Sequence, residues 1–182
     1  DKYPRKNDSS SLGDWVVDKN KLPNGIEGLL KDAQKNGVKF GIWIEPEMIS
    51  EDSDLYREHP DWALTIPGRN PVHARNQLVL DFSRKEVVDH IFDQICKVLD
   101  QGNIEYVKWD MNRHLTDLGS AYLDRKNQNE LSHRYVLGLY QVMETLTERF
   151  PQVLFESCSS GGGRFDAGML YYMPQTWTSD NT

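Results

Sequence analysis

The sequence is short of the features that mark several common protein classes. It has only two cysteines, Cys96 and Cys158, which are too few for a disulfide framework and stand in no metal-type spacing such as C-x-x-C. Its 21 Lys and Arg are outnumbered by 28 Asp and Glu, which argues against the basic surface that binds nucleic acid or an anionic membrane. No apolar run approaches the roughly 20 residues that span a bilayer. We therefore expect a protein of a reducing compartment, the cytoplasm, with neither nucleic acid nor membrane as a partner.

Motifs for metals and nucleotides are also missing. The five histidines form no H-x-H or H-x-x-x-H pair, so no metal site is predicted. No G-x-G-x-x-G run follows a predicted strand, which disfavours a dinucleotide-binding fold. The SSGGG run at 159–163 lacks the Lys-Ser/Thr ending of a phosphate loop, although its glycines would let the backbone approach any ligand closely. We predict no cofactor, and the net charge of -7 suits a neutral or cationic substrate.

The sequence does contain an alternation of helical and strand patterns. With 182 residues, 38% of them hydrophobic, it has material for one sizeable core, so residues 1–182 are expected to form a single domain. Ser83 and Glu86 have the spacing of a capping box at the start of one helix. Helices are predicted over 25–37, 54–59, 83–101 and 131–150. Strands are predicted over 38–44, 78–82, 104–110, 153–157 and 175–179.

Strands that alternate with helices form parallel sheets, which leaves two architectures: an open doubly wound sheet or a closed (β/α)8 barrel. The location of the polar residues decides between them. Each predicted strand ends in polar side chains, and barrels build their active sites from the carboxyl ends of their strands. A whole barrel needs about 250 residues. The predicted fold class is therefore α/β, a partial TIM (β/α)8 barrel of roughly strands two to six with their helices.

The stretch IEYVKWDMNR at 104–113 passes from an apolar strand into charge. Successive side chains of a strand point to opposite faces, so Lys108, Asp110 and Asn112 share one face. Burying such a set costs free energy unless its members pair with one another or with a ligand. The pattern therefore favours a functional site around Asp110.

Other strand-end carboxylates have simpler explanations. Asp81 directly precedes a predicted helix and suits a helix cap. Glu45 and Glu47 flank a proline, and either could be structural. Asp180 follows Trp177 at the end of the last predicted strand, and its position alone fits a structural or a functional role equally well.

Carboxylates close to tryptophans are what glycoside hydrolysis requires. One carboxylic acid protonates the leaving oxygen, and a second carboxylate meets the oxocarbenium-like carbon. Aromatic faces can stack on the apolar faces of pyranose rings, and Trp43, Trp62, Trp109 and Trp177 are available for this. Ordinary core packing stays an alternative for each of them. The pattern thus predicts a sugar-cleaving site.

Six blocks of the sequence carry a family resemblance. They are SLGDW at 11–15, GIWIEPEM at 41–48, LYREHPDW at 55–62, YVKWDMNR at 106–113, ESCSSGGGRFD at 156–166 and WTSDNT at 177–182. In content and order, these blocks resemble the catalytic barrel of the bacterial α-galactosidases of glycoside hydrolase family 36. The resemblance extends over nearly the whole chain.

The resemblance implies hydrolysis of terminal α-galactosides, of the raffinose and melibiose type, by double displacement with retention. It implies that Asp110, at the end of strand four, is the nucleophile and that Asp180, at the end of strand six, is the general acid and base. We expect the neighbouring Lys108 to keep the Asp110 carboxylate ionised. The implied substrate-binding residues are Trp43, Arg75, Lys108, Asn112, Cys158, Gly161 and Trp177.

The resemblance also implies what lies outside the chain. The family has a first strand ending in an Asp-Asp-Gly-Trp block that holds the galactose, two further strands and flanking β domains. We therefore expect this chain alone to be weakly active or inactive, and the natural protein to be a homo-oligomer. Two alternatives stay open: an α-N-acetylgalactosaminidase on the same scaffold, and a non-catalytic carbohydrate-binding fragment.

Overall fold

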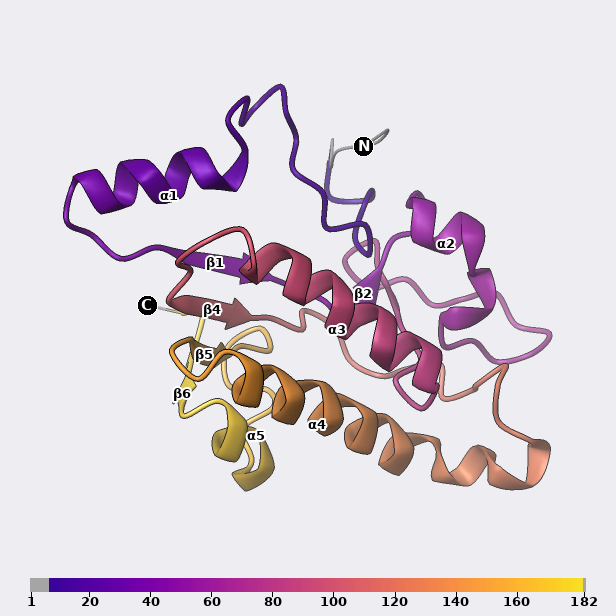
Figure 1. Ribbon diagram of the computed structural model, residues 1–182. Coiled ribbons are helices and arrows are strands. Elements are labelled where there is room, and N and C mark those ends of the chain that lie inside the picture. Colours follow the sequence, from indigo (N-terminus) through magenta and orange to yellow (C-terminus); the bar gives the residue numbers. More distant parts are fainter. Residues whose placement is uncertain (1–6, 182) are drawn as a thin grey trace.

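Four parallel strands form the central sheet (Figure 1). The computed structural model describes residues 7–181. The strand order β1-β4-β5-β6 follows the order of the chain, and every neighbouring pair is parallel. The strands are β1 (Gly41–Ile44), β4 (Tyr106–Trp109), β5 (Leu154–Ser157) and β6 (Gln175–Thr176).

A helix lies between each strand of this sheet and the next along the chain, which is the repeating unit of a β/α barrel. Figure 1 shows α3 and α4 side by side along the sheet, with α5 next to α4. The strand order also follows the chain without the reversal of a doubly wound sheet, so the predicted partial barrel is confirmed. The helices are α1 (Gly25–Lys35), α2 (Asp54–Glu58), α3 (Lys85–Leu99), α4 (Leu131–Arg149) and α5 (Ala167–Tyr172), with 3-10 turns η1 (Pro60–Trp62) and η2 (Arg125–Glu130).

The hydrophobic core lies between the sheet and these helices. The apolar stripes that predicted the two long helices are buried, including Ile91 and Ile95 of α3 and Leu139 of α4. Val107 and Trp109 of β4 are fully buried, and Trp109 lines a small void together with residues of α4 and α5. Burying one such side chain contributes roughly 1.5–3 kcal/mol. Because Val107 and Trp109 occupy this face of β4, the intervening Lys108 faces the other way.

The prediction of a parallel strand over 78–82 is wrong. Its first residues form β3 (Leu78–Val79), which pairs antiparallel with β2 (Met48–Ile49) in a separate two-stranded sheet. Residues 78–82 are all buried, and four of the five are apolar. A short apolar run shows burial but not which strand it will pair with. The central sheet therefore has four consecutive parallel strands within the described residues, not five.

The start of α3 also differs from the prediction. Ser83 does not cap the helix; its backbone N–H and hydroxyl donate to Asp81 Oδ1 at 3.0 and 2.6 Å. The helix begins at Lys85 with Arg84 at the N-cap position. The other Asp81 oxygen accepts a hydrogen bond from Ser120. Asp81 therefore braces the turn before the helix, and the predicted capping box is wrong.

The remaining helix predictions hold. Helix α1 ends near Gly37, which adopts the left-handed conformation with φ of 68°. Helix α2 lies in the predicted stretch, and the Ser53 hydroxyl accepts a hydrogen bond from Tyr56 N–H at 3.0 Å. The parallel strands are shorter than predicted because only part of each predicted stretch is paired with a neighbouring strand.

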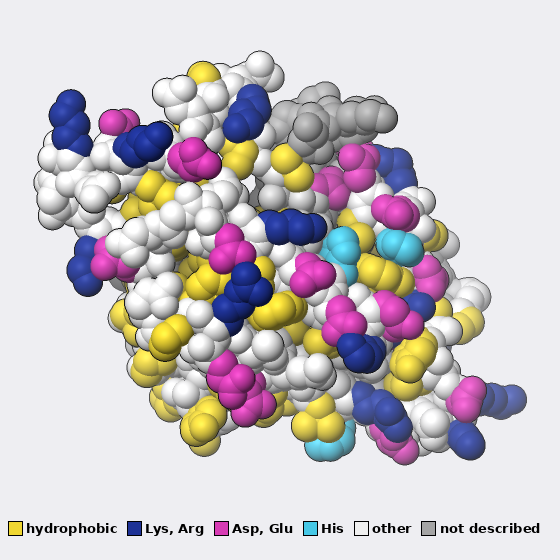
Figure 2. Space-filling view, viewed as in Figure 1, with side chains coloured by type: hydrophobic (Ala, Val, Ile, Leu, Met, Phe, Trp, Pro, Cys, Tyr) yellow, Lys and Arg dark blue, Asp and Glu magenta, His cyan; other side chains and the backbone are white. Residues whose placement is uncertain are grey.

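The surface mixes charges of both signs. Figure 2 shows acidic and basic side chains interspersed on one face of the molecule. Exposed pairs such as Arg149–Asp100, at 2.8 Å, contribute little to stability because water screens them. Among residues 7–181 no helix is long and apolar enough to cross a membrane.

Gly138 permits the closest approach between α4 and the chain that precedes α3. A Cβ atom built at this position would lie 1.9 Å from the backbone oxygen of Phe82 and 3.1 Å from Val88 Cγ2. A backbone oxygen cannot move aside as a flexible side chain could. The helix must therefore shift to accept any larger residue.

We predict that Gly138→Ala destabilises the protein by about 1–3 kcal/mol, as overpacking typically does. Alanine in an exposed helix position would instead stabilise it by up to about 1 kcal/mol. Thermal unfolding followed by circular dichroism measures the difference. The control is Gln141→Ala on the exposed face of the same helix, and an unchanged midpoint for Gly138→Ala would contradict the packing argument.

Candidate active site

The carboxyl ends of the parallel strands bring the predicted site residues to one edge of the sheet. Asp110 follows β4 directly, and Asp180 comes four residues after β6. Trp43 lies on β1, opposite Lys108 in the register of the two strands. Cys158 follows β5 and donates its backbone N–H to Trp109 O at 2.9 Å. Parallel strands pointing the same way place these ends together.

Asp110 is a buried carboxylate surrounded by donors. Its Oδ2 accepts hydrogen bonds from Trp43 Nε1 at 2.9 Å and from Asn112 Nδ2 at 2.8 Å, and its Oδ1 accepts one from Met111 N–H at 2.9 Å. Burial by itself would raise the pKa of Asp110. The hydrogen bonds from Trp43, Cys158, Asn112 and Met111 outweigh burial, and the net pKa is lowered. The hydrogen bonds therefore favour the ionised form of Asp110, the form that a nucleophilic carboxylate needs.

Lys108 lies in the site, and its contacts are with Glu156 and Trp177. Its Nζ is 3.7 Å from Glu156 Oε1 and 3.9 Å from the centroid of the Trp177 ring. Glu156 is buried, and a buried charge needs a partner of opposite charge. The two residues therefore form an ion pair. Hydrogen bonds, not Lys108, lead the effects that keep Asp110 ionised, which corrects the sequence-based expectation.

Asp180 resembles Asp110 in one respect. The Trp177 indole N–H donates to Asp180 Oδ1 at 2.9 Å, as the Trp43 indole donates to Asp110. Trp43 and Trp177 are 39% and 37% exposed, unlike the fully buried Trp109. Each of these two tryptophans thus orients one candidate aspartate and keeps part of its ring accessible to a ligand.

Arg75 reaches the site from a strained turn. Arg75 and the following Asn76 both adopt the left-handed conformation, with φ of 52° and 58°, which costs roughly 1–3 kcal/mol per residue. Arg75 Nη1 donates to Asn112 Oδ1 at 3.1 Å. The buried Arg113 holds the base of this turn, because its guanidinium donates to the backbone oxygens of Val72 and Gln77.

Glu45 orients Asn112 from behind. Its Oε1 accepts the Asn112 backbone N–H at 2.7 Å, and its Oε2 accepts Gln77 Nε2 at 3.0 Å. Burial is the main cause that raises the pKa of Glu45, the charge of Asp110 adds to it, and the hydrogen bonds from Asn112 only partly compensate. The sequence left Glu45 open as a structural residue, and the structure places it next to the candidate nucleophile.

The loop after β5 contacts both Asp110 and the segment that carries Asp180. The thiol of Cys158 is hydrogen-bonded to Asp110, and burial raises the thiol pKa to about 11. Gly161 has φ of 87°, and a Cβ there would lie 3.0 Å from Ser179 Cα. Gly162 N–H donates to Thr178 O at 3.1 Å. The glycines therefore let this loop pack against the segment that carries Asp180.

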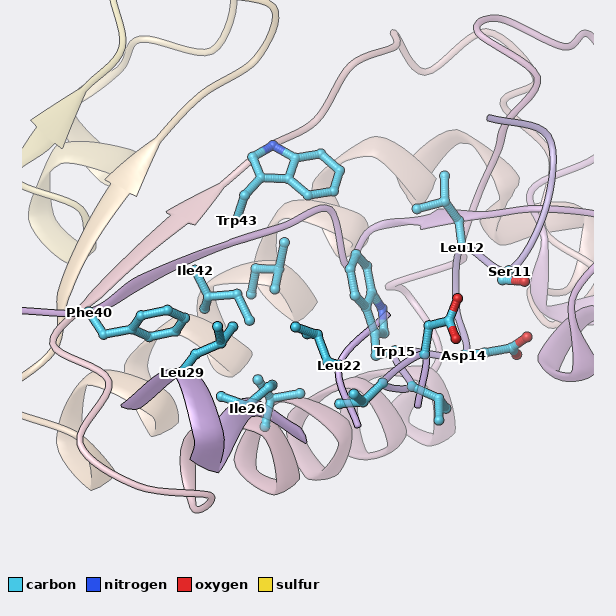
Figure 3. Close-up of a pocket in the computed structure, with 15 residues that line it drawn as sticks. Ser11, Leu12, Asp14, Trp15, Leu22, Ile26, Leu29, Phe40, Ile42 and Trp43 are labelled. Carbon is cyan, nitrogen blue, oxygen red and sulfur yellow. The ribbon is translucent and has the colours of Figure 1, made fainter. Parts of the chain in front are cut away.

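An apolar groove of about 390 Å³ lies beside the site, between α1 and the outer edge of β1. In Figure 3 the side chains of Ile26 and Leu29 lie on one side of it and those of Phe40 and Ile42 near them, with Trp43 at the rim. Asp110 and Asp180 do not line it. We therefore assign this groove to packing between elements and not to the reacting sugar.

The fold and the site together define a class. A partial β/α barrel presents two aspartates and two accessible tryptophan rings at its strand ends, which are the groups that a glycoside hydrolase uses. The chain belongs to the melibiase family, whose family model matches residues 3–182.

Named relatives agree with this membership. The chain is 60% identical over 178 residues to α-galactosidase AgaA of Geobacillus stearothermophilus, covering 98% of this chain and 24% of that protein. It is 61% identical to the bifunctional α-galactosidase/sucrose kinase AgaSK of Mediterraneibacter gnavus, covering 98% and 18%. The crystal structure of the GH36 enzyme AgaA superposes with a TM-score of 0.94 over 97% of this chain. The chain thus spans about a quarter or less of these relatives.

We predict that Glu45→Gln changes how stability depends on pH. The folded protein binds the Glu45 proton more tightly than the unfolded chain, so wild type loses stability as pH rises from the ordinary value of 4.5 up to the raised pKa. Glutamine keeps an acceptor for Asn112 N–H and does not ionise. The unfolding midpoint of Glu45→Gln minus that of wild type should therefore become more positive as pH rises through this window.

The matched control is Glu148→Gln on the exposed face of α4. It removes a carboxylate from the surface, so the difference for Glu45→Gln should rise relative to the difference for this control over the same pH range. A difference for Glu45→Gln that runs parallel to that of the control would show that Glu45 ionises as easily in the folded protein as in the unfolded chain.

Proposed function

We propose that the natural protein is a retaining α-galactosidase that removes terminal α-galactosyl residues from oligosaccharides of the raffinose and melibiose type. The observation that carries this proposal is the pair of strand-end aspartates, Asp110 and Asp180, each hydrogen-bonded to the indole of an accessible tryptophan. The donors around Asp110 support its role as the ionised partner.

Relatives support the substrate class. Variants of AgaA, 60% identical to this chain, have been crystallised with raffinose and with stachyose, both of which are α-galactosides. In the raffinose complex one aspartate is replaced by asparagine, and in the stachyose complex another is replaced by alanine. The two replaced positions are 70 residues apart in that enzyme. Asp110 and Asp180 have the same separation in this chain, which supports assigning the chemistry to this pair.

In the proposed mechanism, the Asp110 carboxylate attacks the anomeric carbon while Asp180 gives its proton to the departing glycosidic oxygen. A covalent galactosyl ester on Asp110 forms, and the aglycone leaves. Asp180, now a carboxylate, takes a proton from water, and the resulting oxygen nucleophile attacks the same carbon and frees Asp110. Two displacements at one carbon give galactose with retained configuration.

The other site residues bind the sugar in this proposal. Lys108 and Asn112 donate to galactose hydroxyls, and Trp43 and Trp177 wall the ring. Arg75 supports Asn112, to which it is hydrogen-bonded. The loop carrying Cys158 and Gly161 lies against the sugar, next to the segment of Asp180.

Nothing in the structure or among the named relatives favours the two alternatives, an α-N-acetylgalactosaminidase and a non-catalytic binding fragment. A cytoplasmic location and a homo-oligomeric natural protein stay part of the proposal.

We predict that a fluorinated galactosyl reagent labels Asp110 in the natural full-length protein. Mass spectrometry of peptides locates the ester, and a label on another carboxylate would overturn the assignment.

Asp180→Ala should lower kcat about 100-fold to 10,000-fold on a substrate that needs a protonated leaving group, the usual contribution of a general acid. Asp89→Asn on the surface of α3 serves as the control and should keep full activity.

We predict that the 182-residue chain alone turns over raffinose weakly or not at all. The outer edges of β1 and β6 are unpaired within the described residues, and exposed strand edges and apolar surface favour association over a stable fold. Turnover of the chain is compared with that of the full-length protein at equal molar concentration. Equal rates would mean that residues 1–182 contain a complete site.

A further inference from the structure

A buried ion pair lies behind the strand end that carries Asp110. The Glu47 carboxylate is fully buried, and Arg164 Nη1 donates to both of its oxygens at 2.7 and 2.8 Å. Glu47 also accepts hydrogen bonds from Trp109 Nε1 at 2.8 Å and from the Tyr135 hydroxyl. This carboxylate therefore connects β4, α4 and the loop after β5.

The pair contacts both residues that flank Asp110. Glu47 binds the indole of Trp109, and Arg164 Nη1 lies 3.1 Å from the sulfur of Met111. Side chains alternate at the end of β4, so these two point to the wall of the barrel while Asp110 points to the site. Holding Trp109 and Met111 in place therefore fixes the backbone from which the Asp110 carboxylate projects.

Arg164 also ends the glycine loop of the site. In this loop the Ser160 hydroxyl donates to Asn112 Oδ1 at 3.2 Å, and Gly162 N–H donates to Thr178 O at 3.1 Å. The Ser159 hydroxyl donates to Met111 O at 3.0 Å. A run of three glycines has little intrinsic rigidity. The guanidinium at its end provides the side-chain anchor that ties the loop to Glu47.

We propose that Arg164 is a positioning residue of the sugar site: paired with Glu47, it holds the loop carrying Cys158 and Gly161 and the end of β4 in one fixed arrangement. The proposal rests on the function proposed above. Arg164 touches no reacting atom and acts through Asp110, Asn112 and the loop backbone.

Two considerations favour positioning over a gain in stability. Removing two charges from water costs about as much free energy as their attraction returns, so a buried pair is weak evidence for stability. The guanidinium Nε and Nη2 of Arg164 are buried without a hydrogen-bond partner among the described residues, which adds to that cost. The position of the pair next to both neighbours of Asp110 gives a reason for its presence that stability does not.

The test compares Arg164→Lys with wild type in the natural full-length protein. Lysine keeps the charge and loses the planar fork that grips both Glu47 oxygens. Active sites are counted by calorimetric titration with 1-deoxygalactonojirimycin, the compound seen in a crystal of AgaA. We expect kcat per titrated site on raffinose to fall about 100-fold, the effect of misplacing a reacting group by about 1 Å. The control is Arg149→Lys, which alters an exposed ion pair and should leave kcat and KM unchanged.

A purely structural role would lower the unfolding midpoint and the number of titrated sites but leave kcat and KM per site at wild-type values, and that result would overturn the proposal. The double variant Glu47→Gln/Arg164→Met replaces the pair by neutral groups and guards against misfolding of the single variant. It should fold and still lose kcat; if it too fails to fold, the pair serves stability and the proposal is wrong. A wild-type protein that does not turn over raffinose would instead refute the proposed function.

Discussion

The alternation of side chains at the end of β4 is the constraint on which the rest of this structure depends. Five consecutive residues, 108 to 112, divide between two environments. The side chains of Trp109 and Met111 are buried in the wall of the barrel. Those of Lys108, Asp110 and Asn112 face the inside of the barrel, where the candidate site lies. Parallel pairing of β4 with β1 and β5 fixes this division, because a slip of one residue would exchange the two faces. The core and the site are thus specified by the same register.

Around Asp110, short-range hydrogen bonds matter more than formal charge. The Lys108 cation is paired with Glu156, and the dipoles of two side chains, a thiol and a backbone N–H hold the carboxylate ionised. A carboxylate that accepts several such bonds has its charge stabilised by donors that cannot be protonated or screened away. Tryptophan serves this purpose well, since one residue supplies both a donor and an aromatic wall.

Much of this arrangement was predictable from the sequence, and the failures have physical causes. The sequence predicted the amphipathic stripes of α3 and α4 and the polar strand ends. Burial of one face makes apolar residues recur at a regular spacing along each helix and strand, and this spacing can be recognised in the sequence. The pairing of residues 78–79 with β2 was not predicted, since partner choice depends on residues far away in the sequence. The Ser83 capping box failed because Asp81, two residues earlier, accepts the Ser83 N–H that Glu86 would accept in such a box.

The sequence also did not predict the residues that position the candidate catalytic residues without being part of that set. The ion pair of Glu47 with Arg164 joins positions 117 residues apart, in two separate sequence blocks, and nothing local to either block predicts that they pair. Family resemblance located the candidate catalytic residues, while the contacts that position them emerged only from the packed structure.

The raised pKa of Cys158 has a consequence for the durability of the site. With a pKa of about 11, roughly one thiol in ten thousand is ionised at neutral pH, and it is the thiolate that peroxides and alkylating agents attack. A sulfur atom can therefore lie beside Asp110, the candidate nucleophile, as a small, polarizable hydrogen-bond donor while resisting the oxidation that would turn it into a bulky, charged acid.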